Sequence, residues 1–440
     1  MNSTPELSLR HIARAWWPLA ASWALMTLEG PAQSAFVARL ANAEVNLATW
    51  GGIVSPFSFF IASPIIMMLS ASTALAKDYP TYLSLRRFMM QMGFVLTALH
   101  ALIAFTPLYD VVARRLIGAP EAIIEPGRIG LRIVIPWAWA IGFRRFNQGV
   151  MIRFGHPKAV GTGTLIRLSA NLIVLFIGYA IGTIPGIVVA CLAVTTGVVS
   201  EAIYAGVRVR PIVRHEVIHA PRVEPLSTQD FLAFYVPLAL TSLIWVIIQP
   251  FGSAAISRMP DALASLAAWP VVNGLLFLLR SPGMAYNEVV IAQMDRAGAA
   301  KSLRRFATLL LVTTTAITLA IVTTPLANIW LHTVMALSPD LTRISQQALW
   351  LGLGLPALAV LISWYQGGLM HSKHTRGITE ATTAYSLIMV AIFGAGIALQ
   401  RYEGLFVAIV AYEVAGLAQV GWLWGRSQRT DEFAFPEITM

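Results

Sequence analysis

Charged side chains are scarce in this sequence. Only 12% of its 440 residues are charged, while 57% are hydrophobic and the mean hydropathy is +0.69. A soluble globular domain carries about 25% charged residues and about 45–50% apolar ones. This shortage of charge excludes an ordinary soluble protein, and we expect the chain to lie in a membrane.

Cysteine is nearly absent as well. Cys191 is the only cysteine, which excludes intramolecular disulfides and a thiolate metal cluster, and we expect it to be a small core residue. The sequence also lacks a Gly-Lys-Ser/Thr phosphate loop, a metal-ligand cluster and a nucleophile with an assignable base. We therefore predict no cofactor and no enzymatic activity.

Long apolar segments recur along the whole chain. Each has about the 17–25 residues that a helix needs to cross hydrocarbon. Barrel strands would alternate polar and apolar side chains, whereas a segment such as LIVLFIGYAIG at 172–182 is apolar on every face. We predict an all-α polytopic membrane protein with twelve transmembrane helices. The predicted segments are 16–38, 47–75, 88–110, 130–152, 162–182, 185–207, 232–256, 264–290, 305–332, 346–370, 378–399 and 404–424.

The basic residues alternate between the loops that join these segments. Of the 31 Lys and Arg residues, 21 fall at the termini and in every second loop, and eight fall in the other loops. Under the positive-inside rule, both termini are predicted to be cytoplasmic, in a bacterial inner (plasma) membrane. The net charge of +10 then reflects topology, and no nucleic-acid partner is expected. The two remaining arginines, Arg167 and Arg280, lie inside apolar segments.

The pentapeptide SLRRF occurs at 84–88 and again at 302–306. Collinear matches extend it, because Arg39 aligns with Arg258 and other pairs follow at nearly the same offset. These further pairs are Gln148-Gly149 with Gln366-Gly367 and His156 with His374. Six predicted helices separate equivalent positions, so the halves form two parallel six-helix repeats. We predict an N-terminal bundle at 1–210, a cytoplasmic linker at 211–229 and a C-terminal bundle at 230–440, in a monomer.

The repeated residues also have local interpretations. In SLRRF we expect Ser84 and its counterpart to cap a helix start and the arginines to meet anionic headgroups, although an intracellular gate or lipid contact stays open. The duplicated glycines Gly149 and Gly367 are expected to permit close packing. The two histidines are expected to be loop residues.

Helix-breaking and acidic residues stand together in the first segment. Glu29 lies near its middle and is followed by Gly30 and Pro31. Proline removes a backbone donor, so a bend and free carbonyls are expected beside the carboxylate. Glu29 is therefore a candidate proton or cation site, and the alternative is a buried carboxylate satisfied by Gln33 or another helix.

Other polar residues also qualify as pathway candidates. Arg39 and Arg258 are repeat-equivalent and suit a carboxylate or phosphate, or else they extend to the membrane interface. Gln249 precedes Pro250 in the segment 232–256, which ends just before Arg258. The segment 264–290 carries Asn273, Arg280 and Glu288 at spacings that place them on one helix face, to line a cleft or to form an ion pair.

Several short motifs resemble those of a known superfamily. They are VNLATWGGIVSP at 45–56, HALIAFTPL at 100–108, FYVPLAL at 234–240 and GGLMHSKHT at 367–375. With the duplicated six helices, they resemble the multidrug/oligosaccharidyl-lipid/polysaccharide flippase superfamily, which includes the MATE exporters, and within it the progressive ankylosis protein family. The resemblance implies a MATE-like antiporter fold. For the ankylosis branch it implies export of small anions such as pyrophosphate, nucleotides or citrate, and for the MATE branch it implies ion-coupled export of organic cations.

Three functional hypotheses follow. The first is a secondary transporter that exports a small organic ion, an anion by our reading, by alternating access, with a proton or cation as coupling ion. The second is a flippase for a lipid-linked glycan. A MATE-type proton-coupled multidrug exporter is a further alternative within transport. The third hypothesis is a membrane scaffold or enzyme without transport. Membrane lipids are expected partners in every case.

Overall fold

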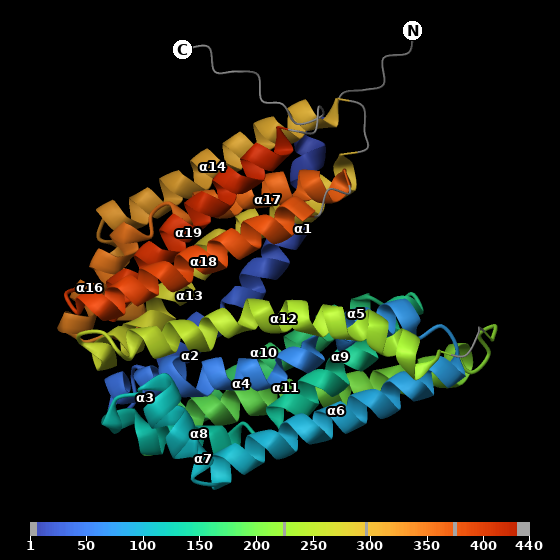
Figure 1. Cartoon of the computed structure of the whole chain (residues 1–440), viewed down its shortest axis with the longest axis horizontal. Coiled ribbons are helices and arrows are strands. Elements are labelled where there is room, and N and C mark those ends of the chain that lie inside the picture. Colours follow the sequence, from blue (N-terminus) through green and yellow to red (C-terminus); the bar gives the residue numbers. More distant parts are fainter. Residues whose placement is uncertain (1–6, 223–225, 295–297, 373–375, 429–440) are drawn as a thin grey trace. The chain divides into compact units, whose positions relative to one another are not determined.

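The computed structural model describes residues 7–222, 226–294, 298–372 and 376–428. Within these residues the chain is helical and contains no strand, as predicted (Figure 1). Nine helical segments among the described residues are long and apolar enough to cross a membrane. Large apolar side chains lie on their outer surfaces, for example Phe94 and Leu387, which are 72% and 65% exposed. Such surfaces are stable against lipid and costly in water.

Every segment predicted to span the membrane coincides with helical structure. Shorter turns interrupt several spans at Gly and Pro positions, where the backbone ladder is weakest. The helices are α1 (Leu9–Thr27), α2 (Glu29–Val37), α3 (Ala43–Thr49), η1 (Trp50–Val54), α4 (Ser55–Ile66), α5 (Met68–Leu75), α6 (Tyr79–Phe105), α7 (Leu108–Asp110), η2 (Val111–Ile117), η3 (Glu121–Ile123), α8 (Ile124–Ile133), α9 (Trp137–Arg153), α10 (Lys158–Ile181), α11 (Gly186–Ile212), η4 (Val213–Val217), α12 (Thr228–Ile256), α13 (Ala262–Gln293), α14 (Ala299–Thr323), α15 (Leu326–Asn328), η5 (Ile329–Val334), α16 (Pro339–Leu351), α17 (Leu355–His371), α18 (Arg376–Leu399) and α19 (Gly404–Ser427).

The helix boundaries repeat with the offset of the SLRRF pair. Lys158–Ile181 and Arg376–Leu399 begin and end 218 positions apart, as do Trp137–Arg153 and Leu355–His371. Left-handed backbone conformations repeat as well. The pairs with positive φ are Asn42 with Asp261, Gly118 with Ala336, and Gly182 with Gln400. The duplication seen in the sequence is therefore a duplication of backbone structure.

The predicted helix start at SLRRF is wrong. Helix α6 begins at Tyr79, where the Asp78 carboxylate accepts a hydrogen bond from the Thr81 amide at 3.0 Å and the Thr81 hydroxyl bonds back to the Asp78 amide at 3.2 Å. This capping box satisfies the first free amides, so the helix starts before Ser84. In the second copy α14 begins at Ala299, again upstream of the serine, Ser302.

The contacts divide the chain into two compact units. Unit 1 contains residues 1–35 and 259–440, and unit 2 contains residues 36–258. Thus α1 packs with the second half of the chain and α12 with the first half. The predicted division, with a linker at 211–229, was drawn from the repeat and stays a prediction about its two copies.

Specific contacts attach these two helices to their units. In unit 1, the indole of Trp16 donates to the Pro282 carbonyl at 2.9 Å and its ring packs against Phe306 at 5.6 Å. In unit 2, the Tyr235 hydroxyl donates to the Pro64 carbonyl at 2.6 Å, and the Ser253 hydroxyl donates to the Gly51 carbonyl at 3.0 Å. The carbonyl groups of Pro282, Pro64 and Gly51 thus accept side-chain donors inside the helix bundles.

The duplicated glycines lie at close helix crossings, as predicted. A Cβ atom at Gly149 would lie 1.9 Å from the Ser72 hydroxyl, and one at Gly367 would lie 2.7 Å from Val290. Ser72 and Val290 are themselves 218 positions apart. The close packing of α9 on α5 therefore recurs as the packing of α17 on α13.

Candidate functional site

Three helices of unit 2 bring buried charged residues together. We call the group Arg144, Arg145, Gln148, Arg167 and Glu201 the arginine cluster. Arg144 and Gln148 are four residues apart on α9 and therefore share a face. They meet Arg167 of α10 and Glu201 of α11, the two helices that pack most extensively on each other in this unit.

Glu201 is the centre of the arginine cluster. Its side chain is fully buried, and its Oε2 atom lies 3.0 Å from Arg144 Nη1 and 3.2 Å from Arg167 Nε. Gln148 Nε2 donates to the other carboxylate oxygen at 2.8 Å. Both carboxylate oxygens thus have partners, which is the condition for burying a charge in a helix bundle.

Positive charge exceeds negative charge in the arginine cluster. The charged groups that act on Arg145 are Arg144, Arg167 and Glu201, so three guanidinium groups face one carboxylate among the described residues. Ionisable residues inside membrane helices are costly and commonly mark substrate or ion pathways. The excess of positive charge makes this part of unit 2 attractive to an anion.

Unit 1 contains a second polar cluster with different chemistry. Arg280 of α13 is close enough to Tyr385 of α18 and to Tyr412 and Glu413 of α19 to act on them electrostatically. The rings of Tyr385 and Tyr412 meet edge to face at 6.4 Å. Arg280 and Glu413 place opposite charges near each other, so this tyrosine-lined cluster has no excess of positive charge.

The first predicted site residue, Glu29, begins α2 directly after the break at Leu28. The bend expected near Pro31 is therefore present, and Pro31 lies against Gly274 of α13 within unit 1. Gln33 is only 3% exposed, and its Nε2 atom has no hydrogen-bond partner among the described residues. The amide nitrogen thus does not hold Glu29. The role of Glu29 and Gln33 in ion binding stays a prediction.

Arg258 binds backbone carbonyl groups of unit 2. Its Nη1 atom donates to Ile117 and Ala254 at 2.6 and 2.7 Å, and its Nη2 atom donates to Arg115 and Leu116 at 2.9 and 2.8 Å. It thereby satisfies carbonyls at the end of η2, which have no helical partner.

Two other predicted pathway residues in this unit are exposed. Arg39, the repeat counterpart of Arg258, and Gln249 both have exposed side chains. Substrate contact by Arg39, Gln249 and Arg258 stays a prediction.

The three polar residues predicted on one helix all lie on α13. Asn273 and Arg280 are half-buried, whereas Glu288 is exposed. Arg280 faces the tyrosines and Glu413 described above. Lining of a pathway by Asn273, Arg280 and Glu288 stays a prediction.

The main acidic partners of these arginines were not predicted from the sequence. Glu201 and Glu413 each stand inside an apolar segment, and that isolation was the available signal. Arg144 and Arg145 were counted among the basic residues of a loop, whereas both lie inside α9, which extends to Arg153, and Arg144 pairs with Glu201. Cys191 is buried, as expected.

Charged side chains outside the spans form a separate network in unit 2. Arg128 donates to Asp110 at 2.9 and 3.0 Å, and this hydrogen bonding holds the pKa of Asp110 below its usual range. Arg114 pairs with Glu121 and lowers the pKa of that carboxyl in the same way. The network joins α7 and η2 to η3 and α8, so its role is to hold this connection together.

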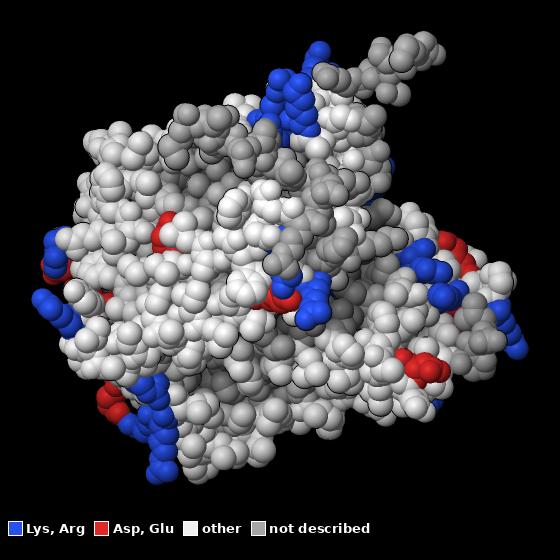
Figure 2. Space-filling view, turned by 45° about the horizontal axis from the view of Figure 1, so that its top comes forward, with Lys and Arg blue, Asp and Glu red and all other residues white. Residues whose placement is uncertain are grey.

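The histidines do not form a metal site among the described residues, and no group of three or more His, Cys, Asp or Glu side chains there is placed to hold a metal. His156 lies in the turn between α9 and α10, where its Nε2 atom is 2.8 Å from Glu216. His374 lies outside the described residues. Figure 2 shows charged side chains in separate patches, with wide uncharged surfaces between them on the visible face.

Comparison with known proteins places the fold. Neither a protein-family profile nor a curated protein sequence matches the chain. Among solved structures, an inward-facing multidrug resistance MATE family transporter of the MOP superfamily is 16% identical, with a TM-score of 0.70 over 94% of this chain and 98% of that one. The lipid II flippase MurJ in an inward closed conformation is 17% identical, with a TM-score of 0.71 over 94% of this chain and 88% of that one.

A third solved structure differs in the polarity that is described for its binding pocket. It is a MOP superfamily transporter from Pyrococcus furiosus whose binding pocket is described as having reverse polarity, suggesting a different function. It is 17% identical, with a TM-score of 0.59 over 96% of both chains. The chain described here therefore has the fold of the MOP superfamily transporters.

Proposed function

We propose that this chain is a secondary transporter that exports a small organic anion by alternating access of its two six-helix repeats. The fold supports transport, since the solved structures that share it are transporters and a flippase. One observation supports an anion as substrate, namely the three arginines that surround the single carboxylate Glu201.

Arg145 is the residue of the arginine cluster best suited to bind substrate. Arg144 and Arg167 are within ion-pair distance of Glu201, whereas no such contact is made by Arg145 among the described residues. Its Nε atom is buried and has no hydrogen-bond partner there. A guanidinium group in this position can bind a carboxylate or phosphate through two parallel hydrogen bonds.

The test is transport by purified protein in liposomes with an imposed proton gradient. Labelled citrate, pyrophosphate and ATP serve as anionic probes, and ethidium serves as a cationic one. We expect an anion to accumulate above the protein-free background and Arg145→Gln to reduce its flux by at least about tenfold, because a charge-assisted contact worth about 1.5–3 kcal/mol is lost.

The matched control is Arg153→Gln, which removes an exposed arginine from the same helix. This variant is expected to keep its flux. Equal anion flux in Arg145→Gln and Arg153→Gln would show that the arginine cluster does not bind the transported anion. Flux of ethidium without any anion flux would favour a MATE-type exporter instead.

A flippase for a lipid-linked glycan is the second candidate. The specific observation is the similarity to the lipid II flippase MurJ, which has the highest TM-score of the three comparisons described above. Such a substrate carries a phosphate-linked headgroup and would also favour cationic residues. Translocation of a fluorescent lipid-linked glycan in the same liposomes, without flux of citrate, pyrophosphate or ATP, would support this alternative.

A further inference from the structure

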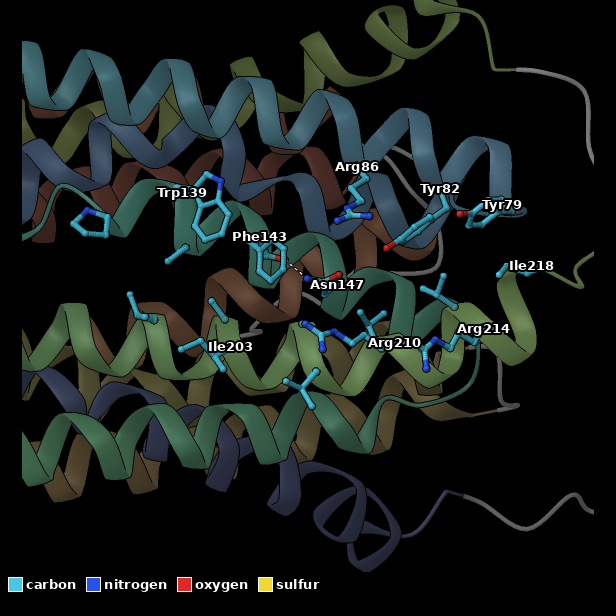
Figure 3. Close-up of a pocket in the computed structure, with 18 residues that line it drawn as sticks. Tyr79, Tyr82, Arg86, Trp139, Phe143, Asn147, Ile203, Arg210, Arg214 and Ile218 are labelled. Atoms are coloured by element: carbon cyan, nitrogen blue, oxygen red, sulfur yellow. Dashed lines mark hydrogen bonds between the residues drawn. The ribbon is translucent and has the colours of Figure 1, made fainter.

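We propose that unit 2 binds one anionic phospholipid in a groove between α6, α9 and α11, separate from the arginine cluster. The groove encloses a cavity of about 790 Å³. Six of its lining residues carry the argument, and Figure 3 shows them. They are Arg86, Arg210, Arg214, Trp139, Phe143 and Ile203. This inference does not rest on the proposed transport activity.

The two halves of the groove differ in chemistry. Arg86, Arg210 and Arg214 lie in the half near Tyr79 and Tyr82, where α6 begins and α11 ends (Figure 3). Trp139, Phe143 and Ile203 lie farther along the same groove. A basic end followed by an aromatic and aliphatic stretch matches a ligand with an anionic head and apolar chains.

The basic end of the groove has no acidic counterpart. Among the described residues that line the groove there is no Asp or Glu, and none of the three arginines is within ion-pair distance of a described carboxylate. Three clustered guanidinium groups repel one another unless an anion or solvent lies between them. A phosphate group satisfies them through bidentate hydrogen bonds.

The apolar part of the groove opens onto the outer surface of the helices. Ile203 and Val207 of α11 are 62% and 55% exposed, on a helix long and apolar enough to span the membrane. In the membrane such side chains meet hydrocarbon rather than water. A lipid that diffuses in the bilayer can therefore enter from the side, whereas a soluble anion would gain nothing from this apolar wall.

The groove is not a by-product of the internal repeat. At the offset of 218, Trp139 corresponds to Ala357, Phe143 to Leu361 and Arg210 to Gln428. The second copy of the fold thus forms the same helices without this combination of residues. Arg86, the first arginine of SLRRF, is the duplicated member, and its neighbour Arg87 does not line the groove.

Native mass spectrometry of the purified full chain tests the proposal. The probes are phosphatidylglycerol and phosphatidylcholine with identical acyl chains. We expect the protein to retain one phosphatidylglycerol in preference to phosphatidylcholine. We expect Arg86→Gln/Arg210→Gln/Arg214→Gln to weaken this binding by on the order of a hundredfold, because each arginine near a membrane surface contributes about fivefold.

The matched control is Arg87→Gln/Arg208→Gln, which removes exposed arginines of α6 and α11 outside the groove. It should bind phosphatidylglycerol like the unaltered chain. Thermal unfolding in neutral lipid checks that both variants are folded. Equal loss of binding in both variants, or equal retention of the two lipids by the unaltered chain, overturns the proposal.

A second measurement locates the lipid and separates it from a free anion. Phosphatidylglycerol brominated on its acyl chains should quench tryptophan fluorescence, and Trp139→Phe should remove part of that quenching. Brominated phosphatidylcholine should show no such difference. Quenching unaffected by Trp139→Phe, or full displacement of the lipid by millimolar inorganic phosphate, contradicts a lipid site here.

Discussion

At the scale of single residues, Arg258 shows how an arginine in a membrane protein can bind the protein itself. Two of its guanidinium nitrogens donate to four backbone carbonyls, three of them at the end of η2. No other side chain offers this fork of parallel donors. Arg258 therefore has a structural task, whatever its part in substrate binding.

Replacing Arg258 by alanine is expected to destabilise unit 2. The carbonyl groups of residues 115–117 would lose charge-assisted hydrogen bonds, at a cost of about 1–3 kcal/mol. Thermal unfolding of the purified protein in detergent measures this loss. Arg208→Ala removes an exposed arginine and should change the melting temperature little, and equal melting of Arg258→Ala and Arg208→Ala would refute the structural task.

A second residue-scale prediction concerns Gly149. A methyl group there would lie 1.9 Å from the Ser72 hydroxyl and 2.4 Å from the Leu69 carbonyl oxygen. Gly149→Ala should separate α9 from α5 and cost about 1–3 kcal/mol. Gly161→Ala on α10 meets nothing within 4 Å and should be neutral or stabilising, because alanine is the better helix former. A lower melting temperature for Gly161→Ala than for Gly149→Ala would contradict the packing described.

Local sequence patterns predicted the structural setting of some residues but not of others. The close packing at Gly149 and the position of Arg167 and Arg280 within helices followed from residue type and apolar context. The capping of α6 did not, because the cap is Asp78, which forms a capping box with Thr81 upstream of Ser84. The pairing of Arg144 with Glu201 joins α9 to α11 across 57 positions, and no local pattern indicates which charged residues a fold brings together.

At the scale of elements, the connection between α7 and α8 depends on charge. Arg128 and Arg114 lie against Asp110 and Glu121, and both carboxyl groups have lowered pKa values. A carboxyl with a lowered pKa in the folded state stabilises that state above its unfolded pKa, which is about 3.9 for Asp. The stabilisation is lost as the pH falls through the folded value.

The prediction for this connection is a pH-dependent one. The melting temperature of the unaltered chain should fall between about pH 5 and about pH 3, and Asp110→Asn should show less of this fall. Asp340→Asn, at the exposed start of α16, is the matched control and should follow the unaltered chain. If Asp110→Asn loses as much stability in acid as Asp340→Asn does, the network does not contribute.

The order of the helices was the most predictable feature at this scale. Apolar length alone locates a span, because an unpaired backbone is excluded from hydrocarbon. Breaks within spans were harder to predict. The interruption at Leu28 was indicated by Gly30 and Pro31, whereas the π-helical turn at Trp50–Val54 depends on packing against other helices and was not predicted.

At the scale of the whole molecule, the main feature is the duplication of a six-helix unit within the chain. Helix bounds and left-handed residues recur at offsets of 218 or 219 positions. The chemistry inside the copies has diverged, since unit 2 carries the arginine cluster and unit 1 carries Arg280 with two tyrosines and Glu413. The fold was predictable from the repeat because duplicated backbones keep one pattern of spans. The site was not, because its charged residues are not duplicated.

The repeat also predicts membrane topology. Twelve spans place both ends of the chain on one side, which the basic loops assign to the cytoplasm. On a Cys191→Ser background, Ser8→Cys and Gln428→Cys should react with a membrane-impermeant thiol reagent only from the cytoplasmic side. Glu121→Cys should react only from the opposite side. Labelling of the two ends from different sides would contradict two parallel six-helix repeats.

The proposed export of an anion is tested most directly by a transport screen with probes that are matched in size. Purified protein in liposomes is offered organic probes of similar size that differ in the sign of their charge, under one proton gradient. We expect protein-dependent flux of one or more anions and none of the cations, with the anion flux reduced at least about tenfold in Arg145→Gln. Flux of cations alone, or flux of neither class above protein-free liposomes, would contradict this proposal.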